Sequence, residues 1–400
     1  MIIRKNRISS FVAVILVIAF SLGIISSCSV QKDVSKGLVY DEALNFWYSE
    51  KEEYKGLVGI MRKGCSDSPE IRGTYILATD DDVIFIGGVN SRETDGKTPV
   101  NAYTTYEIGS LTKVFTATAV FQLIEKGRLS LDDTIDKFFP EYAHGRKITV
   151  YRLLHMQSGI RRELMDTDLK SVENGGKEEI EKFGKYWFTD GFSEEEMMEE
   201  FFKADLDYEP GTRYQYSNAG YFLLAKIIEK ASGMQYREYI KKHIFNVCRM
   251  DHTTSMERGG LTSVPETTFP NASTPYEIDK LFDDLYLGVV SSKGNGDIHS
   301  CAADLLAFDR ALIGGKLIKD ESLAQMLHFD LGYACGWMEV PGRSNVYYHS
   351  GGTPLYHTEN TYCKSRKFGN VYLIELHSTY ADVKPSGDII KSVLLYLGMN

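Results

Sequence analysis

Hydrophobic and polar positions follow two different periods along this chain, and the change between them predicts the order of its elements. Period-two or short apolar runs bounded by turn residues predict strands at 56–62, 71–79 and 83–88, with Asp80-Asp81-Asp82 as the turn between the last two. Similar runs predict late strands at 332–340, 346–349 and 371–377. Strands near both ends with helices between them predict a sheet domain that is interrupted by a helical insertion.

Helical spacing predicts the other elements. The segment after Ser110 is apolar nearly all round, which is typical of a buried helix, and Gly127 marks its end. Ser193 followed by Glu196 is a capping-box pattern that predicts a helix to about Lys203. Further helices are predicted at 42–54, at 218–231 before Gly233, at 297–313 and at 386–397.

The N-terminus has the pattern of an export signal. Three basic residues, Arg4, Lys5 and Arg7, precede an apolar run from Phe11 to Ile25, which is shorter than the ~20 residues of a membrane-spanning helix. The small residues before Cys28 resemble a bacterial lipoprotein box. We therefore expect a signal peptide at 1–27, a lipidated Cys28 and a tether at 28–39. The alternative is an uncleaved N-terminal anchor, and either would hold the protein at a membrane outside the cytoplasm.

Charge and cysteine content narrow the function classes. The net charge of −10 becomes −13 when the signal, with three positive charges and no acids, is removed. An acidic chain without a basic cluster is a poor nucleic-acid binder. Apart from Cys28, five cysteines remain (Cys65, Cys248, Cys301, Cys335 and Cys363), without a Cys-x-x-Cys pair. We expect no metal and no cofactor, and mostly buried thiols, although one or two disulfides stay open.

Ser110 and Lys113 are the first candidate catalytic residues. They stand three positions apart at the start of a predicted apolar helix, and positions i and i+3 share a helix face. A serine needs a neighbouring base to become a nucleophile, and a lysine in a dry pocket can be that base. The pattern alone is weak, because Ser29 to Lys32 matches it too.

Two later motifs strengthen this interpretation. Tyr216-Ser217-Asn218 is the only Tyr-x-Asn of the sequence, and His349-Ser350-Gly351 is its only His-x-Gly. This order resembles the serine β-lactamase and penicillin-binding-protein superfamily, most of all its class C β-lactamase, D-Ala-D-Ala carboxypeptidase and esterase branch. Further segments that resemble sequences of this superfamily lie around the motifs. They are Leu153-Leu154-His155-Met156-Gln157-Ser158-Gly159, Glu209-Pro210-Gly211-Thr212 and Ala302-Ala303-Asp304-Leu305.

The resemblance implies an α+β fold, with an antiparallel sheet flanked by helices and an all-helical lobe. It places the sheet domain at 40–105 and 286–400, and the helical domain at 106–285. The long polar segment 161–192 is expected either to border the cleft between them or to be a plain surface insertion.

By the same resemblance, Ser110 attacks a carbonyl carbon, and Lys113 accepts or relays its proton. Tyr216 is the second proton-transfer group, and nearby ammonium groups are expected to lower its pKa. Asn218 is expected to hydrogen-bond Lys113 and the substrate. Gly351 and Gly352 are expected to let the backbone approach the substrate, with the N–H groups of Ser110 and Gly352 as the oxyanion hole.

His349 departs from the β-lactamase pattern, which has lysine there. A mostly neutral histidine grips a substrate carboxylate less firmly, so we expect an esterase or peptidase rather than a β-lactamase. The expected partner is a small-molecule or peptide substrate, with cell-wall peptide among the options. The alternatives are a D-Ala-D-Ala carboxypeptidase or true β-lactamase, and a non-catalytic binding protein that keeps the cleft.

Overall fold

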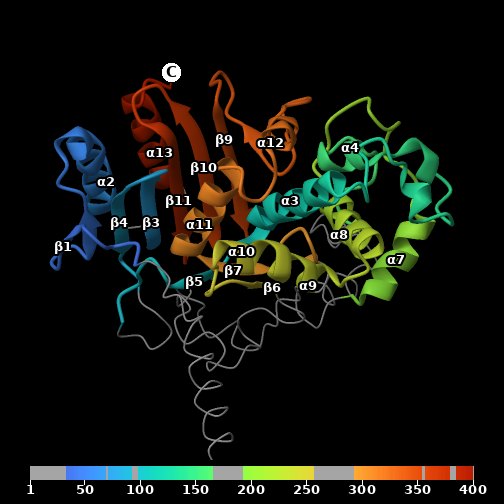
Figure 1. The fold of residues 1–400 in the computed structure, drawn as a ribbon, viewed down its shortest axis with the longest axis horizontal. Coiled ribbons are helices and arrows are strands. Elements are labelled where there is room, and N and C mark those ends of the chain that lie inside the picture. Colours follow the sequence, from blue (N-terminus) through green and yellow to red (C-terminus); the bar gives the residue numbers. More distant parts are fainter. Residues whose placement is uncertain are drawn as a thin grey trace, which may run out of the picture. The chain divides into compact units, whose positions relative to one another are not determined.

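An eight-stranded antiparallel sheet organises the part of the chain that starts at Gly37 (Figure 1). The computed structural model describes residues 33–68, 71–91, 98–164, 192–255, 292–353, 356–378 and 384–399. The strand order is β1-β2-β4-β3-β11-β10-β9-β8. The strands are β1 (Val39–Asp41), β2 (Phe46–Tyr48), β3 (Gly73–Thr79), β4 (Val83–Val89), β8 (Met338–Glu339), β9 (Val346–Gly352), β10 (His357–Ser365) and β11 (Gly369–His377).

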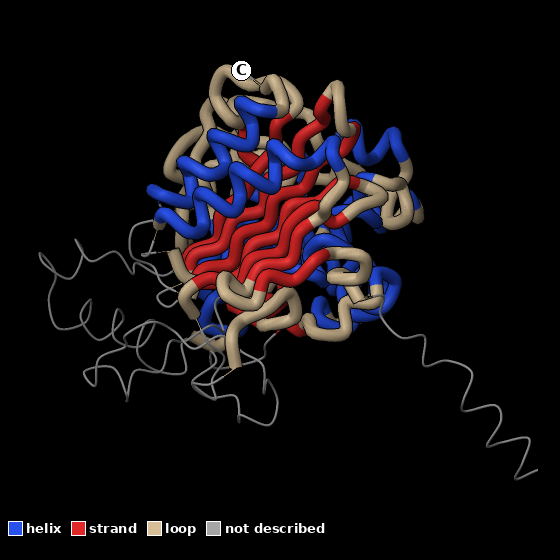
Figure 2. Tube along the Cα trace, turned by 90° about the vertical axis from the view of Figure 1, so that its left-hand side faces the viewer, coloured by secondary structure: helices blue, strands red, loops and turns tan. Residues whose placement is uncertain are grey.

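Two helices cover one face of this sheet, α2 (Lys55–Asp67) and α13 (Lys384–Tyr396) (Figure 2). Their apolar side chains join those of β3, β4 and β11 in one core, which includes Leu57, Met61, Leu77, Leu373 and Val393. α11 (Ala302–Ile313) packs against β3 and β11. The sheet is therefore buried along its middle strands and can hold its neighbours rigidly.

The helices beside the sheet carry the sequence motifs. They are α3 (Thr112–Glu125), α4 (Val150–Leu154), α7 (Glu194–Lys203), α8 (Asn218–Ser232), α9 (Tyr236–Ile240), α10 (Asn246–Cys248) and α12 (Asp320–Met326). Short helical turns lie at Glu52–Tyr54, Gly109–Leu111, Ile135–Lys137, Gly145–Lys147 and Lys241–Phe245. A small sheet of order β5-β7-β6 is formed by Thr105–Glu107, Ile298–Cys301 and Thr254–Ser255. In the sequence, β5 precedes α3, β6 follows α10 and β7 precedes α11. The α+β class expected from the sequence is confirmed.

Several predicted elements are also confirmed. α3 is buried from Thr112 through Leu123, as expected of a helix that is apolar all round. α7 begins with the predicted capping box of Ser193 and Glu196, and α8 ends at Gly233 in a left-handed conformation. The five cysteines from Cys65 onward are buried free thiols.

Other predictions are wrong. Residues 42–54 form the turn of the β1–β2 hairpin, strand β2 and a short helical turn instead of a helix, because Asn45 adopts a φ of 55° and its amide donates to the carbonyls of Gly88 and Val100. Residues 55–67 form α2 instead of a strand, since their buried positions Leu57, Val58, Met61 and Cys65 follow the helical period.

The late part of the chain needs two further corrections. Residues 298–301 form β7 instead of the first turn of a helix, because they pair with both β5 and β6. Of residues 332–340, only Met338–Glu339 form a strand. β10 was not predicted at all, although it lies between β9 and β11.

Three predictions fall wholly or partly outside the described residues. These are the signal segment with Cys28, the first part of the tether (28–32), and segment 161–192 from residue 165 to 191. Among the helices that the structure describes, none has the length and apolar character needed to cross a membrane. The domain boundaries drawn from the sequence stay a prediction.

Candidate active site

Ser110 and Lys113 meet at the junction of a short helical turn and α3. Ser110 lies in the turn Gly109–Leu111, and Lys113 belongs to the first turn of α3. The Lys113 Nζ donates to Ser110 Oγ at 3.0 Å. The spacing of three residues therefore places the amine beside the hydroxyl, as helix geometry predicts.

The Lys113 side chain is fully buried. Burial lowers its pKa well below the ordinary 10.5; the charge of Glu163 opposes this shift, and that of Arg162 adds to it. Its second hydrogen bond runs to the carbonyl oxygen of Asn295 at 2.8 Å. A neutral amine in this position can accept the serine proton.

Tyr216 lies close to the same amine. The Lys113 Nζ is 4.9 Å from the centre of the Tyr216 ring, and the Arg162 guanidinium lies 5.5 Å from the same ring. The expected lowering of its pKa is wrong. Burial raises the pKa of Tyr216 above its ordinary 10.0, and a hydrogen bond with Ser110 and the charge of Arg162 only partly offset this. Tyr216 is therefore a phenol at neutral pH, suited to donate a proton rather than to accept one.

Asn218 is the first residue of α8, while Ser217 caps the helix and accepts from the Gly220 N–H. The Asn218 amide donates to Glu163 Oε1 at 2.5 Å, and its Oδ1 has no hydrogen-bond partner among the described residues. The expected contact to Lys113 is not among the hydrogen bonds of either side chain, because the Asn218 amide is held by Glu163. This Oδ1 is itself shielded from solvent, so the described conformation does not present it to a substrate.

His349 lies on β9, a strand of the large sheet, and its side chain is fully buried. Its Nε2 is 3.1 Å from the Tyr333 hydroxyl, and its Nδ1 is 2.7 Å from the Ser350 carbonyl oxygen. Burial lowers the pKa of His349 to about 3, and the charge of Lys113 adds to this. The ring is therefore neutral at physiological pH, and both its nitrogens have partners within the protein.

Backbone glycines bring β9 against the nucleophile turn. Gly109 has a φ of 50°, and a Cβ built on it would lie 3.0 Å from the Gly352 nitrogen. A Cβ on Gly351 would collide with the Ile108 carbonyl oxygen. Only glycine therefore allows the end of β9 to lie beside Ser110, where the N–H groups of Ser110 and Gly352 are candidates for an oxyanion hole.

The sequence motifs did not predict two groups at this site, the Glu163 carboxyl and the Asn295 carbonyl. Glu163 stands four residues after Ser158-Gly159, in a stretch whose polarity predicts only a loop. Asn295 acts through its backbone carbonyl, which no side-chain motif can reveal. The Gly294-Asn295-Gly296 triplet signals a tight turn, and this was the available clue.

Comparison with known proteins decides the family. The family model described as Beta-lactamase matches residues 63–393. The chain belongs to this family. It is 28% identical to penicillin-binding protein 4* of Bacillus subtilis (strain 168) over 313 residues, which are 72% of this chain and 64% of that protein. The chain thus spans less than two thirds of that relative's length.

Solved structures agree with this assignment. An octameric penicillin-binding protein homologue from Pyrococcus abyssi is 25% identical with a TM-score of 0.65, and the match covers 87% of this chain and 78% of that one. A D-amino acid amidase from Ochrobactrum anthropi SV3 is 19% identical with a TM-score of 0.65, over 86% of this chain and 97% of that one. The second likeness shows the fold alone. The superfamily suggested by the sequence motifs is therefore confirmed.

Proposed function

We propose that this protein is a serine hydrolase that cleaves an ester or amide bond through an acyl-enzyme on Ser110. The observation that carries the proposal is the buried amine of Lys113, 3.0 Å from Ser110 Oγ. An amine held there with a lowered pKa is neutral at the start of the reaction, and it has the serine hydroxyl within reach.

In the first half of the reaction, Lys113 takes the Ser110 proton while Oγ bonds to the substrate carbonyl carbon. The oxyanion that forms accepts hydrogen bonds from the N–H groups of Ser110 and Gly352, and losing one such donor typically costs about 10²–10³ in rate. As the intermediate collapses, Tyr216 donates its proton to the leaving group and is reprotonated from the Lys113 ammonium.

In the second half, a water molecule attacks the acyl carbon of the ester on Ser110. Lys113, neutral again, takes a proton from this water, and the Ser110 oxygen leaves and regains a proton from the Lys113 ammonium. Water is thereby split between the acid product and the leaving group, and the protein returns to its starting state. Asn218 is proposed to orient the substrate, which requires its buried Oδ1 to turn toward the ligand.

The site favours substrates without a carboxylate beside the scissile bond. His349 is neutral and has protein partners on both ring nitrogens, so it offers no positive charge. The nearby guanidinium of Arg162 is paired with the Glu163 carboxyl at 3.7 Å, so it adds little unbalanced positive charge. We therefore rank an esterase, amidase or peptidase above a β-lactamase. The second candidate function is a D-Ala-D-Ala carboxypeptidase that acts on cell-wall peptide, and the likeness to penicillin-binding proteins supports it.

We also propose that the protein is exported and anchored to a bacterial membrane by lipid on Cys28. The basic residues, the apolar run and the small residues before Cys28 support this proposal. Metabolic labelling with a radioactive fatty acid should mark the wild type and not Cys28→Ala. Equal labelling of the two proteins would contradict lipidation at Cys28.

The chemistry is tested by intact-protein mass spectrometry of the full chain in detergent. The protein is exposed in turn to a fluorophosphonate, a penicillin, a p-nitrophenyl ester and an amino acid amide, with Ser110→Ala as the control. An adduct that requires Ser110 supports the proposal, and the reagent that is turned over selects the substrate class. A folded wild type without any adduct would instead favour the non-catalytic binding protein.

A further inference from the structure

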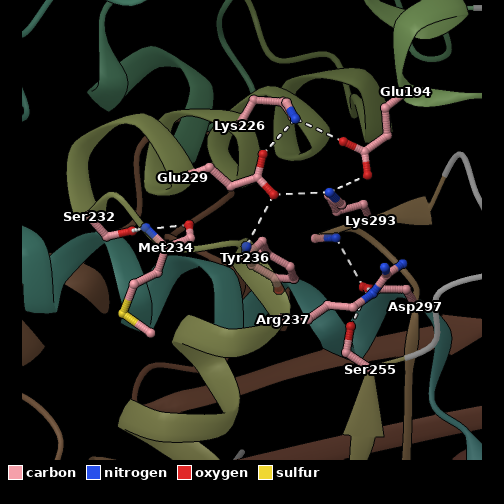
Figure 3. A network of polar contacts seen from close by, with 11 residues as sticks. Glu194, Lys226, Glu229, Ser232, Met234, Tyr236, Arg237, Ser255, Lys293 and Asp297 are labelled. Atoms are coloured by element: carbon pink, nitrogen blue, oxygen red, sulfur yellow. Dashed lines mark hydrogen bonds and ion pairs between the residues drawn. The ribbon is translucent and has the colours of Figure 1, made fainter.

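Lys293 is a buried lysine that the proposed chemistry does not use. Its side chain is only 3% exposed, and its ammonium contacts Glu229 of α8 at 3.0 Å and Glu194 of α7 (Figure 3). Lys226 of α8 contacts the same two acids, at 2.8 Å for Glu194 and 2.5 Å for Glu229. Two lysines and two glutamates thus form one balanced network, which we call the four-charge network.

Lys293 differs from Lys226 in the segment that carries it. Lys293 belongs to the turn 292–297, in which the N–H groups of Asn295 and Gly296 donate to the Ser292 carbonyl at 2.9 and 2.8 Å. The Asn295 carbonyl of this turn accepts the hydrogen bond from Lys113. Lys293 therefore stands two residues from the acceptor that orients the proposed base.

A second contact joins this turn to α3. The Thr116 hydroxyl donates to the Gly294 carbonyl at 2.6 Å and lies 2.8 Å from the Tyr236 hydroxyl. The Tyr236 N–H in turn donates to Glu229 at 3.1 Å, within the four-charge network. The turn, α3, α9 and α8 are thus linked in a closed ring of polar contacts, so a shift of the turn would disturb several bonds at once.

Stability alone does not account for Lys293. A buried ion pair is weak evidence for stability, because removing charges from water costs about as much as the pair regains. Lys226 already contacts both Glu194 and Glu229, so each acid keeps a partner without Lys293. What Lys293 adds is a link between the turn 292–297 and the helices α7 and α8, because it contacts Glu194 and Glu229 from that turn.

We propose that Lys293 is a positioning residue that, through the four-charge network, holds the Asn295 carbonyl where it directs the Lys113 amine at Ser110. The proposal rests on the acyl-enzyme chemistry proposed above. Without this tie the turn gains freedom, water reaches the Lys113 amine, and the amine spends less time in line with Ser110 Oγ. A misplacement of about 1 Å can cost about 10²-fold in rate.

The structure provides a matched control, because Lys293→Met and Lys226→Met each remove one positive charge from the same two acids. Only Lys293→Met removes the tie between the turn and the two acids, while the Thr116 contact to Gly294 remains in both variants. The second-order rate of Ser110 labelling by a fluorophosphonate, the kcat and KM for an ester, the pH profile of kcat/KM and the Tm are measured for both. The groups around Lys113 (Tyr216, Tyr221, Glu163, Arg162 and His349) are unchanged in both variants.

We expect Lys293→Met to slow labelling and to lower kcat by roughly 10- to 100-fold with little change in KM. We also expect Lys293→Met to shift the acidic limb of the kcat/KM profile to higher pH, because water that reaches Lys113 raises the pKa of its amine. Lys226→Met should stay within about twofold of the wild type in rate, with an unshifted profile and a comparable change in Tm. Lys293→Arg should recover most of the rate, since it keeps the charge.

Equal effects of Lys293→Met and Lys226→Met on rate and profile would overturn the positioning role and leave the proposed function standing. A wild type that no reagent labels would overturn the proposed function itself. If Lys293→Met does not fold, Glu194→Gln loosens Lys293 from the more exposed side of the network. It should slow labelling by about threefold relative to Lys226→Met, and an unchanged rate would contradict the proposal.

Discussion

The Lys113 amine stands 3.0 Å from the Ser110 hydroxyl and is fully buried. Burial removes the water that would stabilise an ammonium, so the same packing that hides the lysine also makes it a base. The α3 helix supplies this environment because all its residues from Thr112 to Leu123 are buried.

Replacing Lys113 should therefore separate activity from stability. Lys113→Met should lower kcat/KM for an ester by about 10²–10⁴, because the serine loses its base. Its Tm should not fall, since a buried amine is replaced by an apolar chain. In the wild type, kcat/KM should rise with pH through the lowered pKa of Lys113 and reach its plateau well below pH 10.5. Lys126→Met, at the exposed end of the same helix, is the control, and an equal loss there would contradict the role of Lys113.

A methyl group on Gly351 should damage the site through the backbone. Its Cβ would meet the Ile108 carbonyl and lie 2.5 Å from Thr358 Oγ1, so the end of β9 must shift away from Ser110. We expect Gly351→Ala to lower kcat by more than about 10²-fold, as the loss of an oxyanion donor does, and to cost about 1–3 kcal/mol of stability.

Gly59→Ala is the control for Gly351→Ala. Gly59 lies in α2, and nothing stands within 4 Å of its Cβ position. It should leave kcat unchanged and stabilise the protein by up to about 1 kcal/mol. Steady-state kinetics and thermal unfolding measure both variants, and a Gly351→Ala enzyme of normal kcat would argue against the oxyanion arrangement.

The buried carboxyl of Asp309 should make stability depend on pH. Asn360 donates to Asp309 Oδ1 at 3.0 Å, while Asp309 Oδ2 and Asn360 Oδ1 have no hydrogen-bond partner among the described residues. Burial raises the pKa of Asp309 to about 8, and the Asn360 hydrogen bond opposes this. A proton on Asp309 Oδ2 could be donated to Asn360 Oδ1, which would satisfy both atoms.

The sign of the effect follows from the two states. Between the unfolded pKa of about 3.9 and the folded pKa of about 8, the folded state holds a proton that the unfolded state has released. Stability should therefore fall with rising pH in this window, by at most about 1.4 kcal/mol per pH unit. The buried carboxyls of Glu359 and Glu375, whose pKa burial also raises, add to the same slope, so Asp309→Asn should reduce the slope and be more stable than the wild type at pH 8. Urea unfolding between pH 5 and 8.5 measures it, with the exposed Asp67→Asn as control, and parallel curves would contradict the assignment.

A charge at position 349 should change substrate preference. His349→Lys would place an ammonium beside Tyr333 in the middle of β9, at a position that is buried in the wild type. We expect its kcat/KM for substrates with a carboxylate beside the scissile bond to rise relative to that for neutral esters. His349→Gln, which stays neutral, should leave the ratio unchanged. The same ratio in all three proteins would show that position 349 does not select for charge.

Elements whose residues carry their own signal were predictable. The capping box of Ser193, the left-handed Gly233 and the apolar surface of α3 are local patterns, and each lies where the sequence indicated. The β1–β2 hairpin was not predictable, because Asn45 adopts its positive φ while its amide bonds to Gly88 and Val100, which are distant in the sequence. β7 likewise forms because two other strands pair with it.

The sequence alone determined the family motifs and the pairing of Ser110 with Lys113, since three helical residues suffice to place one beside the other. The tertiary structure decided the protonation state of the site. Burial by distant segments lowers the pKa of Lys113 and raises that of Tyr216, and the same packing brings in the Asn295 carbonyl and Glu163. These are effects of desolvation and long-range contact, and neither is a property of the residues that a local pattern contains.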